Sequence, residues 1–145
     1  MAPQPVTALR HHHEYAAKVV CGVVKEKGPL NLGLYFTAVN VHNPSTVEAV
    51  FCVKLAIARP GAGGSISGYH KFALKPDQAL EIDCEMIRKI AGGLDFVKGF
   101  VVIKCKTELD VVAVYTAGSL ETGHVATMHS ERVPVRVLAA PMPDC

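Results

Sequence analysis

Residues 47–59, "VEAVFCVKLAIAR", decide the fold class of this chain. Apolar side chains recur at every second position of this stretch, and they are Val47, Ala49, Phe51, Val53, Leu55 and Ile57. A period of two predicts a β-strand that is buried on one face. The alternate set is mixed and still partly apolar, because it contains Val50, Cys52, Ala56 and Ala58 beside Glu48 and Lys54. An outer face of this kind is more apolar than a monomer in water normally shows.

Strand-like segments continue on both sides of this stretch. "GLYFTAVNV" (33–41) precedes it, and the turn-forming "HNPST" between the two predicts a hairpin over 34–58. "FVKGFVVIKCK" (96–106) and "LDVVAVYTA" (109–117) are the most apolar segments and predict a second hairpin of central strands. "PGAGGSISG" (60–68) is typical of a flexible loop, and Pro134 favours an edge position for the closing segment because proline cannot donate to a β-ladder.

One short helix is expected near 84–92, in "DCEMIRKIAGG". Asp83 fits the N-cap, Glu85 lies in the first turn, and Gly92 fits the C-terminal stop. The pattern as a whole predicts an all-β fold, an antiparallel β-sandwich of about seven or eight strands, jelly-roll or immunoglobulin-like. We expect an N-terminal extension over 1–14, one β-sandwich domain over 15–138 and a C-terminal tail over 139–145.

Composition excludes several partner classes. The 145 residues are 50% hydrophobic and carry a net charge of +2, with the charges interspersed and no basic run, so we expect no nucleic acid partner. The apolar runs are far shorter than the ~20 residues of a membrane-spanning helix, so we expect no membrane span. The start, "MAPQPVTALR", contains no apolar signal-peptide core. We therefore expect a cytoplasmic protein, or a surface or extracellular one if a leader has been removed.

The five cysteines form no C-x-x-C motif and match no zinc-site spacing. With no visible signal peptide, we expect reduced thiols that pack as small hydrophobic groups. Cys84 lies at the expected helix start, where a thiolate would be stabilised, but the neighbouring Asp83 and Glu85 oppose that effect. Cys145 is terminal, and we expect it to be exposed and able to cross-link two chains.

A histidine run precedes the first expected strand. His11, His12 and His13 have the ligand chemistry for Zn, Cu or Ni and are the candidate metal ligands of this sequence. Successive side chains of an extended chain point in opposite directions, however, so three adjacent imidazoles rarely converge on one ion. We interpret the run as a polar lead-in to the strand. No nucleophile motif or phosphate-binding loop is present in the sequence, and we expect neither a catalytic residue nor a cofactor.

Three segments carry a resemblance to known proteins: "FTAVNVHNPSTVEAVFCVKLAIA" (36–58), "KFALKPDQALEIDCEMI" (71–87) and "FVVIKCKTELDVVAVYTA" (100–117). Over residues 15–137 the chain resembles small uncharacterised bacterial β-domains, and its segment order is similar to that of sensory-rhodopsin-transducer-like proteins. That resemblance implies a cytoplasmic, oligomeric and non-enzymatic sandwich that binds partners or small ligands.

Three hypotheses about function follow. The first is a non-catalytic protein that self-associates into a homo-oligomer or fibre-like assembly, with its termini exchanged between neighbours as added strands. The second is a cytoplasmic module that binds a small ligand or transduces a signal. The third is a metal-dependent enzyme of the small β-barrel type, which would need the histidine run as ligands.

Overall fold

The computed structural model describes residues 10–145, which form ten strands and one helix. The elements are β1 (His12–Val24), β2 (Gly33–His42), β3 (Ala49–Arg59), β4 (Ala62–Ile66), β5 (His70–Leu74), β6 (Ala79–Ile82), α1 (Cys84–Ile90), β7 (Val97–Cys105), β8 (Asp110–Gly118), β9 (Val125–Arg132) and β10 (Arg136–Leu138). The fold is all-β with antiparallel pairing, as the alternation predicted, and it has more strands than expected. Residues 60–68, expected to be a loop, contain β4, which pairs with β3.

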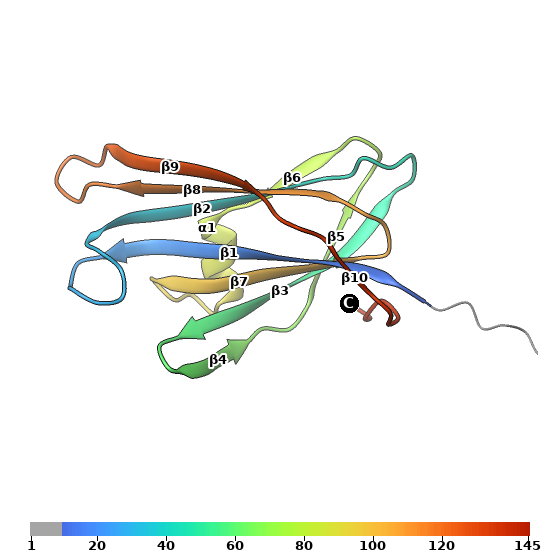
Figure 1. The fold of residues 1–145 in the computed structure, drawn as a ribbon, viewed down its shortest axis with the longest axis horizontal. Coiled ribbons are helices and arrows are strands. Elements are labelled where there is room, and N and C mark those ends of the chain that lie inside the picture. Colours follow the sequence, from blue (N-terminus) through green and yellow to red (C-terminus); the bar gives the residue numbers. More distant parts are fainter. Residues whose placement is uncertain (1–9) are drawn as a thin grey trace, which may run out of the picture.

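The strands divide into two halves joined by β1 (Figure 1). In the first half β7 lies between β1 and β3, while β4 and β5 pair with the other edge of β3 and β10 pairs with the start of β1. In the second half β2 lies between β1 and β8, β6 pairs with β2, and β9 pairs with β8. The segments expected to be central, β7 and β8, each have a neighbour on both sides.

β1 changes partner at Gly22. Cys21 is the last residue of β1 in register with β7, and Gly22 is the first in register with β2, opposite Tyr35. Gly22 has φ +128°, and a Cβ at this position would lie 2.5 Å from the carbonyl oxygen of Asp95. A glycine inside a strand often marks such a bend or close approach of backbones. Gly22 thus permits one strand to serve both halves.

The two predicted hairpins, 34–58 and the one formed by 96–106 with 109–117, are wrong. β2 pairs with β8, and β3 pairs with β7, so both short connections cross from one half to the other. The first crossover is held by Asn43, which is fully buried and donates to the carbonyl oxygens of Val47 (2.8 Å) and Leu74 (3.0 Å). A buried amide that bonds two separate segments makes a corner between layers, where the sequence suggested a tight turn.

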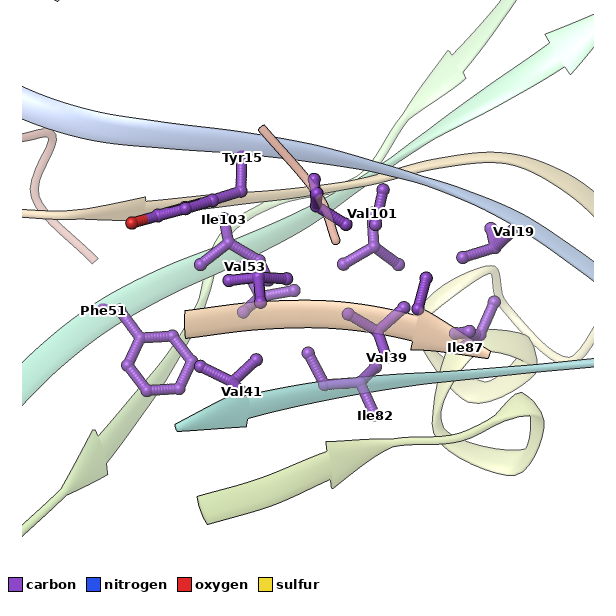
Figure 2. Close-up of a cluster of buried hydrophobic side chains, with 14 of the residues drawn as sticks. Tyr15, Val19, Val39, Val41, Phe51, Val53, Ile82, Ile87, Val101 and Ile103 are labelled. Carbon is purple, nitrogen blue, oxygen red and sulfur yellow. The ribbon is translucent and has the colours of Figure 1, made fainter. Parts of the chain in front are cut away.

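The core lies between the two halves (Figure 2). Val53, Val101 and Ile103 from the first half face Val39 and Ile82 from the second. Along β3 the expected inner positions from Ala49 to Leu55 are buried, whereas Val47, just before the strand, is exposed. One continuous apolar core therefore joins the halves. The alternation of apolar residues correctly predicted which side chains of β3 between Ala49 and Leu55 point into it.

The start of α1 agrees with the sequence prediction, and the start of β1 does not. α1 begins where expected, because the Asp83 carboxylate accepts a hydrogen bond from the Met86 backbone N–H at 2.9 Å. The side chain of Ile87 is buried in the core. No helix within residues 10–145 is long and apolar enough to cross a membrane. β1 starts at His12, inside the stretch expected to be an extension, and residues 1–9 of that extension lie outside the described residues.

Candidate functional site

β9 is an edge strand that is exposed along its full length. It pairs with β8, it ends the strand order, and all eight of its residues are exposed. The backbone N–H of Val133, directly after β9, donates to Val111 on β8. Because hydrogen bonding alternates along an antiparallel pair, the N–H groups of Met128, Ser130 and Arg132 point to the free edge. β9 therefore presents a row of backbone donors and acceptors to whatever approaches it.

An apolar surface continues from β9 across the outside of β8 and β2. We call it the β9 face and define it by Phe36, Ala38, Val112, Val114 and Met128. The register places Phe36, Thr116 and Met128 side by side in one row. Phe36 is 49% exposed and Met128 68% exposed. The intervening residues Val39, Val111 and Ala113 are buried, which shows that the β9 face points away from the core.

Sequence reasoning expected the apolar outer surface on β3 instead. In the structure that surface is only partly covered: Val50 is 39% exposed, whereas Cys52 is 1% exposed because residues 139–145 lie over it. The signal for the β9 face was present in "FTAVNV" and "VVAV", where apolar residues occupy both phases of the alternation. Such runs are typical of strands covered on both faces.

A cavity of about 850 Å³ lies between the C-terminal tail and the first half. One wall is the tail itself, from Pro141 to Cys145. The opposite side includes Val50 and Cys52 of β3 and the basic residues Arg10, His11, Lys71 and Lys106. Glu48 and Asp144 also line the cavity, so its charge is mixed. Such a hollow is large enough for a small organic ligand.

The three candidate metal ligands are not brought together. His11 lines the tail cavity. His12 is 2% exposed, and its Nδ1 lies 2.8 Å from the carbonyl oxygen of Ala140. His13 Nδ1 lies 3.1 Å from the carbonyl oxygen of Lys106. Within residues 10–145 no group of three or more His, Cys, Asp or Glu side chains is placed to hold a metal ion. The run was expected to be a polar lead-in to the first strand, but β1 already begins at His12, and His12 is buried.

Four of the five cysteines are paired, contrary to the expectation of free thiols. One disulfide joins Cys21 of β1 to Cys84 at the start of α1, and the other joins Cys52 of β3 to Cys145. Their Cα atoms are 5.4 and 5.9 Å apart, a normal disulfide separation. Cys145, the expected cross-link between chains, is thus bonded within its own chain. Cys105 is free and buried.

A charged network lies on the outer side of the first half. Glu14 on β1 contacts Lys104 on β7 (3.1 Å) and Arg136 on β10 (2.6 Å). The side chain of Glu14 is 12% exposed and that of Lys104 15%. Burial acts to raise the pKa of Glu14, but the hydrogen bond and charge of Lys104, with the charges of Arg136 and Lys54, outweigh burial and lower this pKa. The network ties β10 to β1.

A smaller cluster surrounds His42 at the end of β2. Its Nδ1 lies 2.9 Å from a carboxylate oxygen of Asp110, and its Nε2 lies 3.7 Å from Asp77. Asp110 also contacts Arg132 at 3.5 Å. A histidine–aspartate pair acts in catalysis when a nucleophile is hydrogen-bonded to the ring, and here the second ring nitrogen faces a carboxylate instead. The cluster joins β2, β8 and β9 electrostatically.

Comparisons with known proteins bear on the fold. No protein-family model matches the chain, and no curated protein matches it either. Among solved structures it is similar to Thermotoga maritima 1070, with a TM-score of 0.53 and 10% identity over 88% of this chain and 95% of that one. At this identity the likeness supports a shared fold.

Proposed function

We propose that this protein is a non-catalytic β-domain that self-associates through the free edge of β9 and the adjoining β9 face. One observation carries the proposal: β9 is an eight-residue edge strand that is exposed at every residue and borders exposed apolar side chains. Folded proteins usually protect long edges with charges, prolines or covering segments, because an open edge pairs with other chains. β9 carries such charges only at Glu131 and Arg132, and the rest of its edge is suited to adding a strand from a second copy.

The sequence of β9 allows a symmetric pairing with itself. A two-fold axis through Ser130 would place this residue opposite its own copy in an antiparallel pair. His129 would then lie opposite Glu131 of the partner subunit, with complementary charge when the imidazole is protonated. The free-edge N–H groups of Met128, Ser130 and Arg132 would all find carbonyl acceptors in this register. The β9 faces of the two copies would join into one larger apolar surface, on which a further layer of copies could pack.

Two substitutions test this interface. Ser130→Pro removes a backbone donor at the free edge and leaves the hydrogen bonds between β9 and β8 in place. Met128→Lys puts a charge on the β9 face. The matched control is Val137→Lys on β10, because Val137 is also an exposed apolar strand residue (59%) but lies outside the β9 face.

The measurement is mass in solution by light scattering or sedimentation at micromolar concentration, under oxidising and reducing conditions. We expect the wild-type chain and Val137→Lys to be oligomeric, and Ser130→Pro and Met128→Lys to shift to monomer with unchanged circular dichroism. A wild-type chain that remains monomeric throughout contradicts the proposal, as does an oligomer that both β9 variants leave intact.

A second candidate function is a small-ligand-binding or signal-transducing module. The tail cavity of about 850 Å³ supports it, and so does the resemblance to sensory-rhodopsin-transducer-like proteins. A thermal-shift screen of small anions and common metabolites tests it, with Lys71→Ala and Lys106→Ala as cavity variants. A hit that both variants abolish favours this function, whereas a screen without hits counts against it.

Two disulfides also bear on where the protein works. Structural disulfides persist mainly in oxidising compartments and at cell surfaces. We therefore infer that the chain reaches such a place, which is the alternative to the cytoplasm that the sequence left open. Mass spectrometry of unreduced peptides from protein made in its native host tests the inference, since both cross-links are expected there and reduced cysteines would refute it.

A further inference from the structure

We propose that the Cys52–Cys145 disulfide is a reducible latch that holds residues 139–145 as the wall of the tail cavity, while Cys21–Cys84 is a permanent cross-link of the core. The inference is independent of the β9 interface, because the latch lies on the first half and β9 is the edge of the second. It assigns separate roles to two bonds that the sequence does not distinguish.

The two disulfides differ in their accessibility. Cys21 and Cys84 are 0% and 5% exposed and belong to the core cluster with Ile87 and Val97. Cys145 is exposed at the end of the chain, although its partner Cys52 is buried. Thiol–disulfide exchange requires a thiolate to reach one sulfur of the bond. A soluble reductant reaches Cys145 in the folded protein, whereas Cys21–Cys84 is shielded until the core opens.

The reduction is a two-step exchange with a dithiol. One thiolate of the reductant attacks the Cys145 sulfur, the Cys52–Cys145 bond breaks, and Cys52 leaves as a thiolate that takes up a proton. The second thiol of the reductant then attacks the mixed disulfide and releases Cys145 as a thiol. The reductant ends as its own disulfide, so two electrons and two protons have passed to the protein.

Few other contacts hold the tail. His12 Nδ1 donates a hydrogen bond to the carbonyl oxygen of Ala140 at 2.8 Å, and Cys52 Sγ lies 3.7 Å from the carbonyl oxygen of Pro143. Pro141 and Pro143 have no N–H with which to join a strand. The preceding β10 adds only three residues in register with β1. Cutting the disulfide therefore leaves residues 139–145 held only by weak contacts, the His12–Ala140 hydrogen bond and a thiol–carbonyl contact from Cys52 to Pro143.

Release of the tail removes one wall of the cavity. Residues Pro141 to Cys145 line it on one side, and Cys52 and Val50 lie on the other. With the tail displaced, the Cys52 thiol and the outer surface of β3 become open to solvent. The thiol state of the surroundings thus determines whether the tail walls this hollow, as under oxidising conditions, or leaves an open strand face, as under reducing ones.

His12 provides a spectroscopic report of the closed state. A carbonyl oxygen only accepts hydrogen bonds, so Nδ1 of His12 carries the proton while Ala140 is in place. Nε2 of the same ring is buried and has no hydrogen-bond partner within residues 10–145. When the tail leaves, solvent reaches the ring and the fixed tautomer becomes a mixture. The ¹⁵N shifts of the His12 imidazole therefore distinguish a latched tail from a released one.

The test treats the folded chain with dithiothreitol without denaturant, then labels thiols with N-ethylmaleimide and identifies them by mass spectrometry. We expect Cys52 and Cys145 to be labelled while Cys21, Cys84 and Cys105 stay unlabelled. The {¹H}–¹⁵N NOE of the Met142 and Asp144 amides should fall together with loss of the single His12 tautomer. Cys145→Ser should show the released state without reductant, and the matched control Cys105→Ser should remain latched until reduced.

Three results would overturn the latch. Labelling of Cys105 at the same rate as Cys52 would mean that reduction opens the whole domain. Unchanged NOE values and an unchanged His12 tautomer after full labelling of Cys52 would mean that the tail stays in place without its disulfide. A chain whose Cys52 resists labelling until denaturant is added would equally reject the selective reduction on which the proposal depends.

Discussion

The hydroxyl of Tyr15 bonds both backbone groups of Leu109: it donates to the carbonyl oxygen at 2.8 Å and accepts from the N–H at 2.7 Å. Tyr15 is 1% exposed on β1, and Leu109 lies in the crossover between β7 and β8. One side chain of the first strand thus satisfies the backbone of a connection 94 residues later. Leu109 is itself only 2% exposed, so water does not readily take the place of this hydroxyl.

Tyr15→Phe should destabilise the fold by about 1–3 kcal/mol, because it leaves a buried donor and acceptor without partners. Tyr35→Phe is the matched control, since its hydroxyl bonds the Asn31 carbonyl in an exposed setting, and we expect about 0.5 kcal/mol or less. Urea unfolding followed by circular dichroism measures both. Equal effects would mean that the Tyr15 bonds do not support the crossover.

Burial also raises the pKa of Tyr15 to about 12. In ultraviolet difference spectra, the Tyr15 hydroxyl should therefore stay protonated at the pH where an ordinary tyrosine ionises.

Gly22→Ala should cost about 2–3 kcal/mol, because the position combines a left-handed φ with a Cβ too close to the Asp95 carbonyl. Gly28→Ala is the control: a Cβ there meets nothing within 4 Å, and the change should be neutral or slightly stabilising. Thermal unfolding compares the two. A tolerated Gly22→Ala would show that β1 can bend between the halves without a glycine.

The sequence predicts the strands of this fold better than it predicts how they pair. Alternation identified most strands and the inward residues of β3, because burial on one face leaves a period of two. Strand partners leave no such trace, so "HNPST" looked like a hairpin turn although Asn43 makes it a corner between layers. The pairing of Cys52 with Cys145 was equally hidden, since 93 residues separate them and only the folded chain brings them together. The β9 face was missed because the expected outer surface was sought on β3.

Glu14→Gln should remove a stabilisation that depends on pH. The folded-state pKa of Glu14 is lowered, so its ionisation stabilises the fold above the ordinary glutamate pKa, and this contribution is lost as the pH falls through the lowered value. We expect the variant to be less stable by about 1 kcal/mol at neutral pH. The difference from wild type should vanish in acid.

Urea unfolding across the acid range checks the Glu14 prediction. Glu26→Gln, in the exposed connection after β1, is the control and should give a curve parallel to wild type. A constant difference between Glu14→Gln and wild type at every pH would show that the network with Lys104 and Arg136 contributes through packing alone.

Removing the Cys21–Cys84 disulfide should lower the free energy of unfolding more than removing the free thiol of Cys105. Replacing Cys21 and Cys84 together by alanine deletes a bond between residues 63 positions apart and should destabilise by about 2–5 kcal/mol. Cys105→Ala deletes one buried sulfur without a cross-link and should cost about 1 kcal/mol. Guanidinium unfolding under oxidising conditions measures both. Similar losses would mean that the cross-link contributes little beyond its packing.

The position of β1 in the sheet has a consequence for folding. β1 pairs with the next strand, β2, only at Gly22–Val24, and the rest of its length pairs with β7 and β10, which are far from it in the sequence. Pairing between such distant segments is slow to form. Until β7 and β10 have paired with it, most of β1 lies without neighbours, and unpaired apolar strands of folding intermediates tend to aggregate. We therefore expect aggregation during refolding to involve residues 12–24.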